Sequence, residues 1–343
     1  MAKGLDLSGS RVLVTGGAGF IGANFVHHLR RAVPKAGVTV LDKLTYAGNP
    51  ANLDPVRNDP GFRFVKGDIC DDAAVKDAMA GCDVVVNFAA ETHVDRSIES
   101  PKDFILTDTV GVYVRLEEAR RIGIKRFVQV STDEVYGEIL TGEATEESPL
   151  LARNPYSASK NGGDRLAYAY FATYGVPTVV TRCSNNYGAY QFPEKLIPLF
   201  VTNALEDKPL PVYGTGTNVR DWIHVEDHCR AIVALLQADD VEGGTFNIAG
   251  GNERSVLQIA DTILKQLKKP ASLLNHVTDR PGHDRRYAID ASRLEKATGF
   301  KPATPFEQGI AATIDWYVSR RDWWEPIRSG EFRQYYERTY GSR

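Results

Sequence analysis

A glycine-rich turn close to the N-terminus restricts the possible folds more than any other feature of this chain. It follows the short apolar run Arg11–Thr15 and reads Gly16-Gly17-Ala18-Gly19-Phe20-Ile21-Gly22. Glycine at three-residue spacing allows a tight turn, close approach of the backbone to a pyrophosphate, and packing of a helix against a strand. The pyrophosphate would lie at the helix N-terminus, where free N–H groups and the helix dipole favour negative charge. The turn predicts a dinucleotide-binding βαβ unit, although alone it is also compatible with a plain tight turn.

The first half of the chain alternates apolar runs with helical segments, as a parallel sheet requires. The runs 38–42, 62–68, 83–89, 127–131 and 177–183 are predicted strands, and 21–31, 73–80 and 110–123 are predicted helices. Right-handed crossovers between them give an α/β fold with a doubly wound, Rossmann-like parallel sheet. Prolines interrupt the elements after about Asn185, which indicates a smaller C-terminal lobe. We expect residues 1–184 to form mainly the dinucleotide-binding domain and 185–343 mainly this lobe, with segments such as 243–249 returning to the sheet.

Composition and charge narrow the class of protein further. The 343 residues are 43% hydrophobic with a net charge of −3, so the chain is globular and has no basic field for nucleic acid or an anionic membrane. No apolar run approaches the ~18 residues of a membrane span, and the first residues lack the layout of a signal peptide. The cysteines are too far apart for a paired zinc motif: Cys70, Cys82, Cys183 and Cys229. We therefore expect a cytoplasmic protein with no metal, no nucleic-acid partner and no membrane anchor.

A carboxylate at the end of the second predicted strand indicates which dinucleotide is bound. Asp42 lies about 20 residues beyond Gly22, the spacing at which an acidic residue binds the hydroxyls of the adenine ribose. The same carboxylate would repel the 2′-phosphate of NADP. NAD is the expected cofactor, although the neighbouring Lys43 weakens this preference.

A tyrosine and a lysine indicate proton chemistry. Tyr156 and Lys160, in Tyr-Ser-Ala-Ser-Lys, lie four residues apart at the start of a predicted helix, so both side chains share one face. An ammonium beside the phenol, with a positive nicotinamide close by, would lower the tyrosine pKa and make a usable base. The alternative is an exposed tyrosine and a solvated lysine, which the position of the motif between the fifth and sixth predicted strands disfavours.

An adjacent carboxyl pair narrows the reaction class. Ser131-Thr132-Asp133-Glu134-Val135-Tyr136-Gly137 follows the fifth predicted strand, and ligands of doubly wound sheets bind at the carboxyl ends of strands. Elimination of water requires one group that protonates the departing hydroxyl and another that removes the proton alpha to a ketone, and Asp133 and Glu134 offer that pair. A simple alcohol dehydrogenase or a 4-epimerase needs no such pair, so a dehydratase is favoured. A capping Thr-Asp beside a solvated Glu134 is the structural alternative.

Beyond these motifs, the chain resembles the dTDP-glucose 4,6-dehydratases, a family of extended short-chain dehydrogenase/reductases, over nearly its whole length. The segments that carry the resemblance are 15–22, 41–49 (LDKLTYAGN), 67–70, 89–97 (AAETHVDRS), 131–137, 154–160, 183–188 (CSNNYG), 192–199 (FPEKLIPL), 220–223 and 278–290 (TDRPGHDRRYAID). The glycine turn and the Tyr-Lys pair define only the superfamily, whereas Thr-Asp-Glu, FPEKLIP and RPGHDRR are much more specific.

The resemblance implies a reaction and a role for each catalytic residue. dTDP-glucose would become dTDP-4-keto-6-deoxyglucose and water, with internal hydride transfer from carbon 4 to carbon 6 through bound NAD. Tyr156 would act as base at the 4-hydroxyl, Thr132 would hydrogen-bond the same oxygen, and Lys160 would hold the nicotinamide ribose. Glu134 would remove the proton from carbon 5, and Asp133 would protonate the leaving hydroxyl of carbon 6.

The same resemblance implies residues around both ligands. The cofactor is expected to contact Gly16, Gly19, Phe20, Ile21, Gly22, Asp42, Lys43, Leu44, Thr45, Asp68, Ile69, Ala89, Ala90, Tyr156, Lys160, Cys183 and Asn186. The nucleotide sugar is expected to contact His93, Thr132, Asn185, Glu194, Lys195, Leu196, Pro211, Tyr213, Arg220, Asn252, Arg280 and His283. The second lobe would therefore be mainly a nucleotide-sugar-binding lobe. A homodimer is implied through the predicted helices 110–123 and 156–174.

Asp108 and Ala189 depart from the family pattern, and three competing functions stay open. Asp108 stands where the family usually has asparagine, and an ionised carboxylate only accepts hydrogen bonds whereas an amide also donates them. A 4,6-dehydratase acting on another nucleotide sugar, such as UDP-glucose, is compatible with these motifs, because nothing in the sequence separates a thymine from a uracil nucleotide. A 4-epimerase and a non-catalytic NAD-binding protein are compatible with the fold but less favoured.

Overall fold

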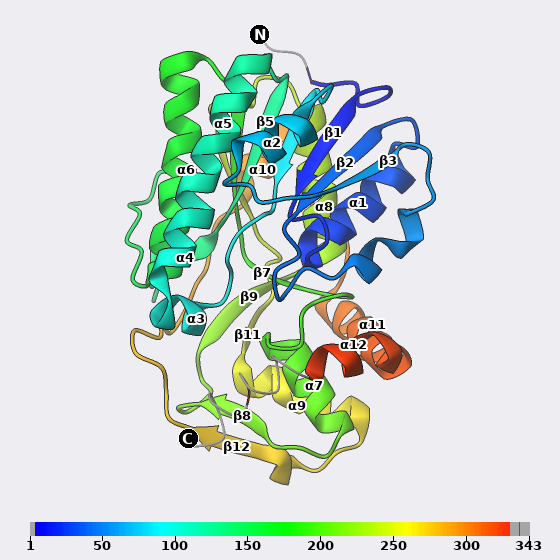
Figure 1. The fold of residues 1–343 in the computed structure, drawn as a ribbon. Helices are drawn as coiled ribbons and strands as arrows, with labels where there is room; N and C mark the ends of the chain where they lie inside the picture. The colour runs from blue at the N-terminus through cyan, green and yellow to red at the C-terminus, as the bar shows by residue number, and fades with distance from the viewer. Residues whose placement is uncertain (1–3, 330–335, 337–343) are drawn as a thin grey trace.

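Seven parallel strands form the central sheet in the order β10-β6-β5-β4-β1-β2-β3 (Figure 1). The computed structural model describes residues 4–329 and 336. The strands are β1 (Arg11–Thr15), β2 (Gly37–Asp42), β3 (Phe62–Lys66), β4 (Val84–Asn87), β5 (Arg126–Thr132), β6 (Thr178–Cys183) and β10 (Thr245–Ile248). Each neighbouring pair is parallel, so the connections cross over the sheet. The predicted doubly wound sheet is confirmed, and the segment expected to return to it forms the edge strand β10.

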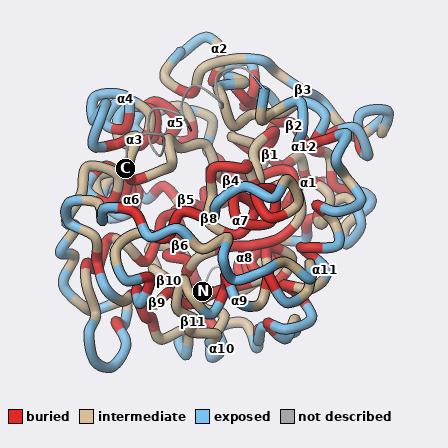
Figure 2. Tube along the Cα trace, turned by 90° about the horizontal axis from the view of Figure 1, so that it is seen from below, coloured by how far each residue is buried: buried red, intermediate tan, exposed pale blue. Residues whose placement is uncertain are grey.

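Helices cover both faces of the sheet, because alternate side chains of each strand point to opposite sides. One face carries α1 (Phe20–Ala32) and α8 (Val225–Gln237), and the other carries α2 (Asp72–Met79), α5 (Gly111–Ile122) and α6 (Pro155–Tyr174) (Figure 1). In β1, Val12 and Val14 pack with α1 and α8, whereas Leu13 packs with α2 and α5. The central strands accordingly run through the buried middle of the molecule (Figure 2).

Short elements form a second layer beyond the carboxyl ends of the central strands (Figure 1). They include β7 (Asn185–Tyr187), β8 (Leu210–Tyr213), β9 (Val219–His224), β11 (Glu253–Ser255), β12 (Leu274–Val277), α7 (Leu196–Leu205), α9 (Val256–Leu267), α11 (Phe306–Ser319) and α12 (Arg321–Arg328). The strands make two small sheets, β11-β9-β7 and β12-β8. Aromatic side chains such as Phe200, Trp222 and Trp324 form the separate core of this layer.

The remaining helical segments are short, and most connect larger elements. They are the 3-10 turns η1 (Pro50–Val56), η3 (Asp133–Tyr136) and η4 (Ala271–Leu273), the π-helical turn η2 (Leu106–Val110), and the helices α3 (Val94–Glu99), α4 (Pro101–Ile105) and α10 (Ser292–Thr298). None of these segments was predicted as a separate helix from the sequence, because three to seven residues show too little periodicity. Within the described residues, no helix has both the length and the apolar character needed to span a membrane.

Candidate active site

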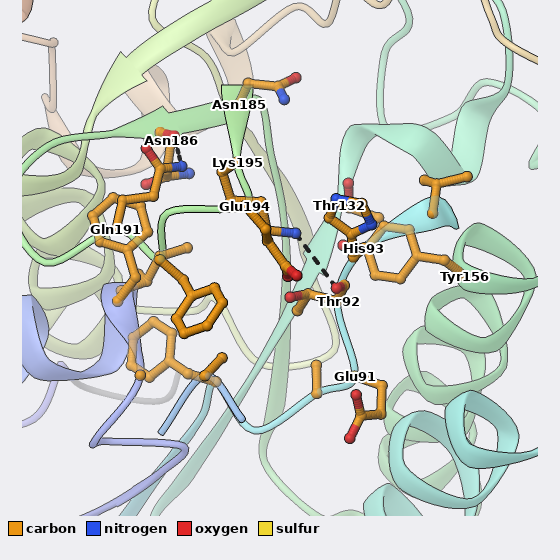
Figure 3. A pocket seen from close by; sticks show the side chains of 18 of the residues that line it. Glu91, Thr92, His93, Thr132, Tyr156, Asn185, Asn186, Gln191, Glu194 and Lys195 are labelled. Atoms are coloured by element: carbon orange, nitrogen blue, oxygen red, sulfur yellow. Dashed lines mark hydrogen bonds between the residues drawn. The ribbon is translucent and has the colours of Figure 1, made fainter. Parts of the chain in front are cut away.

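A cavity of about 450 Å³ lies where the central sheet meets the second layer. Its walls come from the glycine turn after β1, the ends of β2, β4, β5 and β6, the start of α6, and segments around α7, β8 and β9. Doubly wound sheets bind their ligands at this edge. In Figure 3, His93, Thr132 and Tyr156 lie on one side, and Asn185, Glu194 and Lys195 lie across from them. Residues expected at both ligands therefore share one cavity.

The glycine turn leaves no room for a side chain at Gly16 or at Gly22. Gly16 has a φ of +70°, and a Cβ there would lie 2.6 Å from the backbone nitrogen of Ala89. A Cβ on Gly22 would lie 2.2 Å from the carbonyl oxygen of Gly16. Gly19 is the N-cap of α1, with no side-chain cap and no acidic residue in the first turn. The first N–H groups of α1 can therefore meet an anion, so the turn fits the diphosphate of a dinucleotide.

Two carboxylates beside this turn bear on the choice of dinucleotide. Asp42 accepts hydrogen bonds from Ala18 N (2.9 Å) and Leu44 N (2.8 Å), and burial raises its pKa. Lys43, which weakened the expectation of NAD, forms an ion pair with Asp68 at 2.7 Å. Burial acts to raise the pKa of Asp68, but hydrogen bonds, chiefly from Lys43, outweigh it and lower the pKa. The two carboxylates outweigh the single ammonium of Lys43 and would repel the 2′-phosphate of NADP, which supports NAD as the cofactor.

The Tyr-Lys pair occupies the first turns of α6. Asn154 caps this helix by accepting a hydrogen bond from Ser157 N (2.8 Å), and a reciprocal bond completes a capping box. The cap fixes the start of the helix so that Tyr156 and Lys160 both line the cavity. Lys160 Nζ donates a hydrogen bond to Val130 O (2.7 Å), which ties the lysine to the end of β5.

The expectation of a lowered tyrosine pKa is not what the protein's own groups produce. Burial and the charges of Glu134 and Asp108 raise the pKa of Tyr156 well above its usual range, against a hydrogen bond with Thr132 that favours the phenolate. Burial also lowers the pKa of Lys160. The motif identifies the pair, but the depth at which the phenol is buried decides the direction of the shift. The positive nicotinamide would act in the opposite direction.

The carboxyl pair lies on η3, which follows β5 directly. Thr132 caps this turn: its Oγ1 accepts from Glu134 N (3.3 Å) and donates to Asp133 Oδ1 (3.2 Å). Gly137 ends the turn with a φ of +76°. Burial and the charge of Glu134 raise the pKa of Asp133 to about 8. Within the described residues, Asp133 Oδ2 and Glu134 Oε2 are buried without a hydrogen-bond partner. Thr132 does cap, as the structural alternative supposed, but Glu134 is not a solvated surface group.

The segment before α7 supplies the opposite wall of the cavity (Figure 3). Glu194 accepts hydrogen bonds from Arg96 Nε and from the Tyr46 hydroxyl, both at 3.0 Å. Lys195 Nζ donates to Thr92 O (3.4 Å). Burial raises the pKa of Glu194 and lowers that of Lys195. These contacts tie the Phe-Pro-Glu-Lys segment to the segment after β2, the loop after β4 and helix α3.

A buried guanidinium on β9 offers a site for phosphate. Arg220 donates to the carbonyl oxygens of Val219 (2.8 Å) and Asp284 (3.0 Å) and lies over the Tyr287 ring, 4.3 Å from its centroid. These contacts fix the plane of a group that binds phosphate oxygens bidentately. His283 lines the same cavity, and burial lowers its pKa to about 4, so it is neutral there.

Asp95 organises a cluster that was not predicted from the sequence. The Tyr213 hydroxyl donates to Asp95 Oδ2 (3.0 Å), and Arg280 Nη1 lies 3.6 Å from Asp95 Oδ1. His93 Nδ1 lies 3.9 Å from Asp95 Oδ2, and burial keeps the pKa of His93 well below its usual range. One carboxylate from α3 thus holds residues from β8 and from the loop after β12 at the cavity.

Of the site residues expected from the sequence, all but Leu44 and Asn252 line the cavity. Leu44 presents its backbone N–H to Asp42. Asn252 Nδ2 instead donates to the carbonyl oxygens of Trp222 (3.3 Å) and Gly250 (2.8 Å). Lining residues that were not predicted include Glu91, Thr92, Asp95, Gln191 and Asn218. The first three belong to the segment AAETHVDRS, which is part of the family resemblance and from which they could have been predicted as site residues.

A Rossmann-type sheet that presents a Tyr-x-x-x-Lys helix beside a glycine turn places this chain among the extended short-chain dehydrogenase/reductases. Comparison with known proteins gives the family. The chain belongs to the family described as GDP-mannose 4,6 dehydratase, whose model matches residues 13–313.

Several relatives are similar over almost the whole chain. A dTDP-glucose 4,6-dehydratase of Streptomyces niveus is 51% identical over 323 residues, which cover 93% of this chain and 96% of the relative. The structure of DesIV, a dTDP-glucose 4,6-dehydratase of Streptomyces venezuelae solved with NAD and dTDP bound, has a TM-score of 0.90 at 49% identity and covers 92% of this chain and 99% of that one. A Bacillus anthracis dTDP-glucose 4,6-dehydratase in complex with NAD has a TM-score of 0.87 at 45% identity, covering 93% and 99%. The family predicted from the sequence is confirmed.

Proposed function

We propose that this protein is an NAD-dependent dTDP-glucose 4,6-dehydratase, a hydro-lyase that forms dTDP-4-keto-6-deoxyglucose and water. The observation that carries the proposal is the buried pair of Asp133 and Glu134 in one cavity with Tyr156 and Lys160. A 4-epimerase needs no such pair. The relatives support the thymidine nucleotide and NAD, since they bear this name and DesIV was solved with NAD and dTDP.

The first step uses the groups at the start of α6. NAD⁺, held by the glycine turn and Asp42, would supply the redox chemistry as acceptor of the hydride from carbon 4 and its donor to carbon 6, so no external oxidant would be consumed. Tyr156 takes the proton of the 4-hydroxyl, and Thr132, which hydrogen-bonds Tyr156, fixes the same oxygen. Lys160 keeps a positive charge near the phenolate and holds the ribose.

Elimination uses the carboxyl pair. The 4-keto group acidifies the proton on carbon 5, and Glu134 removes it. Asp133 donates its proton to the 6-hydroxyl, which leaves as water. Because the pKa of Asp133 is about 8, this proton is present at neutral pH and is lost as the pH rises through 8. An aspartate in water loses its proton at about pH 4 and would be no acid here. Glu134 returns a proton to carbon 5 when carbon 6 is reduced.

The substrate is tested with the protein as purified and with no added NAD. We expect dTDP-glucose to give the 4-keto-6-deoxy product faster than UDP-glucose or CDP-glucose, with no net formation of reduced cofactor. A faster reaction of UDP-glucose would move the assignment to another nucleotide sugar, and interconversion of glucose and galactose nucleotides would replace it with an epimerase. Bound NAD without turnover of any of the three would support a non-catalytic NAD-binding protein.

We further propose a homodimer that acts in the cytoplasm. Exposed apolar and aromatic side chains gather on η2 and its neighbouring helices α4, α5 and α6: Ile105, Leu106, Val110, Tyr113, Tyr168 and Tyr174. A surface of this kind supports burial against a second copy. The four cysteines are free thiols, as in a reducing compartment. Light scattering should give twice the chain mass at micromolar concentration, and a monomer mass there would contradict the dimer.

A further inference from the structure

A carboxyl that the proposed reaction does not use lies directly behind the Tyr-Lys pair. Asp108 belongs to η2, and its side chain is 2% exposed. Its Oδ1 accepts a hydrogen bond from Glu91 N (2.9 Å), and its Oδ2 accepts one from Ser159 Oγ (2.8 Å). The turn packs closely on α6, because a Cβ at Gly163 would lie only 2.4 Å from Asp108 O. The carboxyl is therefore held beside the residue that precedes Lys160.

Charged and titratable groups reach this carboxyl from each element packed against it. They are Tyr156 and Lys160 from α6, Arg115 from α5, Glu91 from the loop after β4, and, acting through Glu91, Asp103 from α4. Lys160 exerts the largest of these charge effects on Asp108, and Asp108 exerts the largest on Lys160. Asp108 also acts on Tyr156. One carboxyl thus influences both members of the pair.

Arg115 supplies the counter-charge in this arrangement. It is completely buried on α5, and within the described residues its Nε, Nη1 and Nη2 have no hydrogen-bond partner. Burial lowers its pKa, while the charges of Cys70, Asp108 and Asp68 act in the opposite direction. A buried guanidinium is strongly unfavourable without a nearby anion, and ionised Asp108 contributes that anion.

The two protonation states of Asp108 have different effects. When protonated, it can donate to Ser159 Oγ while its other oxygen still accepts from Glu91 N, as an asparagine would. When ionised, it only accepts, favours the ammonium of Lys160 and opposes a phenolate at Tyr156. Burial raises the pKa of Asp108 to about 7, so both states are populated at neutral pH.

We propose that Asp108 is a positioning residue for the first proton transfer, and that the charge it presents behind Ser159 and Lys160 sets how readily Tyr156 ionises. The inference rests on the proposed function, in which Tyr156 is the base. It gives a role to a buried carboxyl that the proposed reaction does not use. At low pH the neutral carboxyl acts as an asparagine amide would, and at higher pH its charge makes the phenolate harder to form.

The substitution Asp108→Asn isolates this charge. An asparagine oxygen accepts from Glu91 N, and its Nδ2 donates to Ser159 Oγ, which in turn donates to Tyr156 O, already 2.8 Å away. We expect the acid limb of the kcat–pH profile to move to lower pH by about one unit, with KM for dTDP-glucose unchanged. Asp72→Asn, an equal charge change at an exposed position of α2 outside the cavity, should leave the profile in place. A loss of kcat at every pH with an unmoved limb would reduce Asp108 to a structural role and overturn the proposal.

Arg115→Met gives a second, independent variant. Removing the counter-charge keeps Asp108 neutral to higher pH, so the limb should move in the same direction as in Asp108→Asn. The double variant should match Asp108→Asn alone, because no carboxyl is left to respond. If the shift of the acid limb in the double variant were the sum of the two single shifts, Arg115 would not act through Asp108.

A spectroscopic titration separates this inference from the proposed function. The ultraviolet difference spectrum of tyrosine ionisation, measured on the NAD-bound protein with a Tyr156→Phe reference, needs no sugar substrate. The Tyr156 transition should lie at lower pH in Asp108→Asn than in the parent protein. If dTDP-glucose is not turned over, this shift still supports the coupling, whereas equal transitions overturn it even in an active dehydratase.

Discussion

Glu134→Gln is expected to leave the oxidation of carbon 4 intact and to lower the yield of 4-keto-6-deoxy product by about 100-fold or more. Glutamine has the shape of glutamate but cannot accept the proton of carbon 5. The hydrogen bond from Glu134 N to Thr132 Oγ1 belongs to the backbone, so η3 should keep its form. The free Glu134 Oε2, buried without a partner among the described residues, is the atom that this substitution disables.

Three readouts locate the step that Glu134→Gln blocks. Near-ultraviolet absorbance of the bound, reduced cofactor should still appear on mixing with dTDP-glucose. Deuterium from solvent should no longer enter carbon 5, and product should no longer accumulate. Glu143→Gln makes the same change at an exposed position outside the cavity and should behave as the parent protein. Loss of cofactor reduction in Glu134→Gln would show that Glu134 acts before elimination and would contradict its role as the carbon 5 base.

Tyr156→Phe should abolish both halves of the reaction, with turnover falling by about 100-fold to 10,000-fold. The substitution removes one hydroxyl. The ring should stay in place, because its edge-on contact with Phe104, at 6.2 Å between centroids, does not involve that hydroxyl. Without the phenolate no group takes the proton of the 4-hydroxyl, so hydride does not leave carbon 4 and the proton on carbon 5 is never acidified.

NAD content and cofactor absorbance test Tyr156→Phe. The variant should bind NAD and dTDP-glucose but show no reduced cofactor and no exchange at carbon 5. Tyr168→Phe, on the exposed side of the same helix, is the matched control and should retain activity. If Tyr156→Phe still reduced the cofactor, another residue would be the base. Tyr156→Phe should therefore stop the reaction before carbon 4 is oxidised, whereas Glu134→Gln should stop it after that oxidation.

Local sequence patterns were enough to predict most of the fold. The first predicted strand coincides with β1, and the others agree within a few residues, because a buried parallel strand needs a continuous apolar run whatever surrounds it. The glycine turn could also be predicted from the sequence, since the spacing of its glycines follows from backbone geometry within one short segment. The same holds for the pairing of Tyr156 with Lys160 on one helix face, which depends only on the helical repeat.

Long-range packing decided the properties of the site. Asp95 meets Tyr213 across 118 positions of sequence, so its part in the cavity could not be read from spacing. The protein's own groups raise the pKa of Tyr156, whereas Lys160 and the nicotinamide were expected from the sequence to lower it. This effect of burial could not be read from the motif, because desolvation depends on everything that covers a group and the motif shows only its neighbours. The burial of Asp108 and of Arg115 was likewise invisible in the sequence. The order of residues along the chain was enough to show which chemical groups are present and on which elements they lie. How much water each group loses, and which charges it meets, depends on segments that come together only in the folded chain. Those two quantities set whether a carboxyl serves as an acid, as a base or as a control on its neighbours.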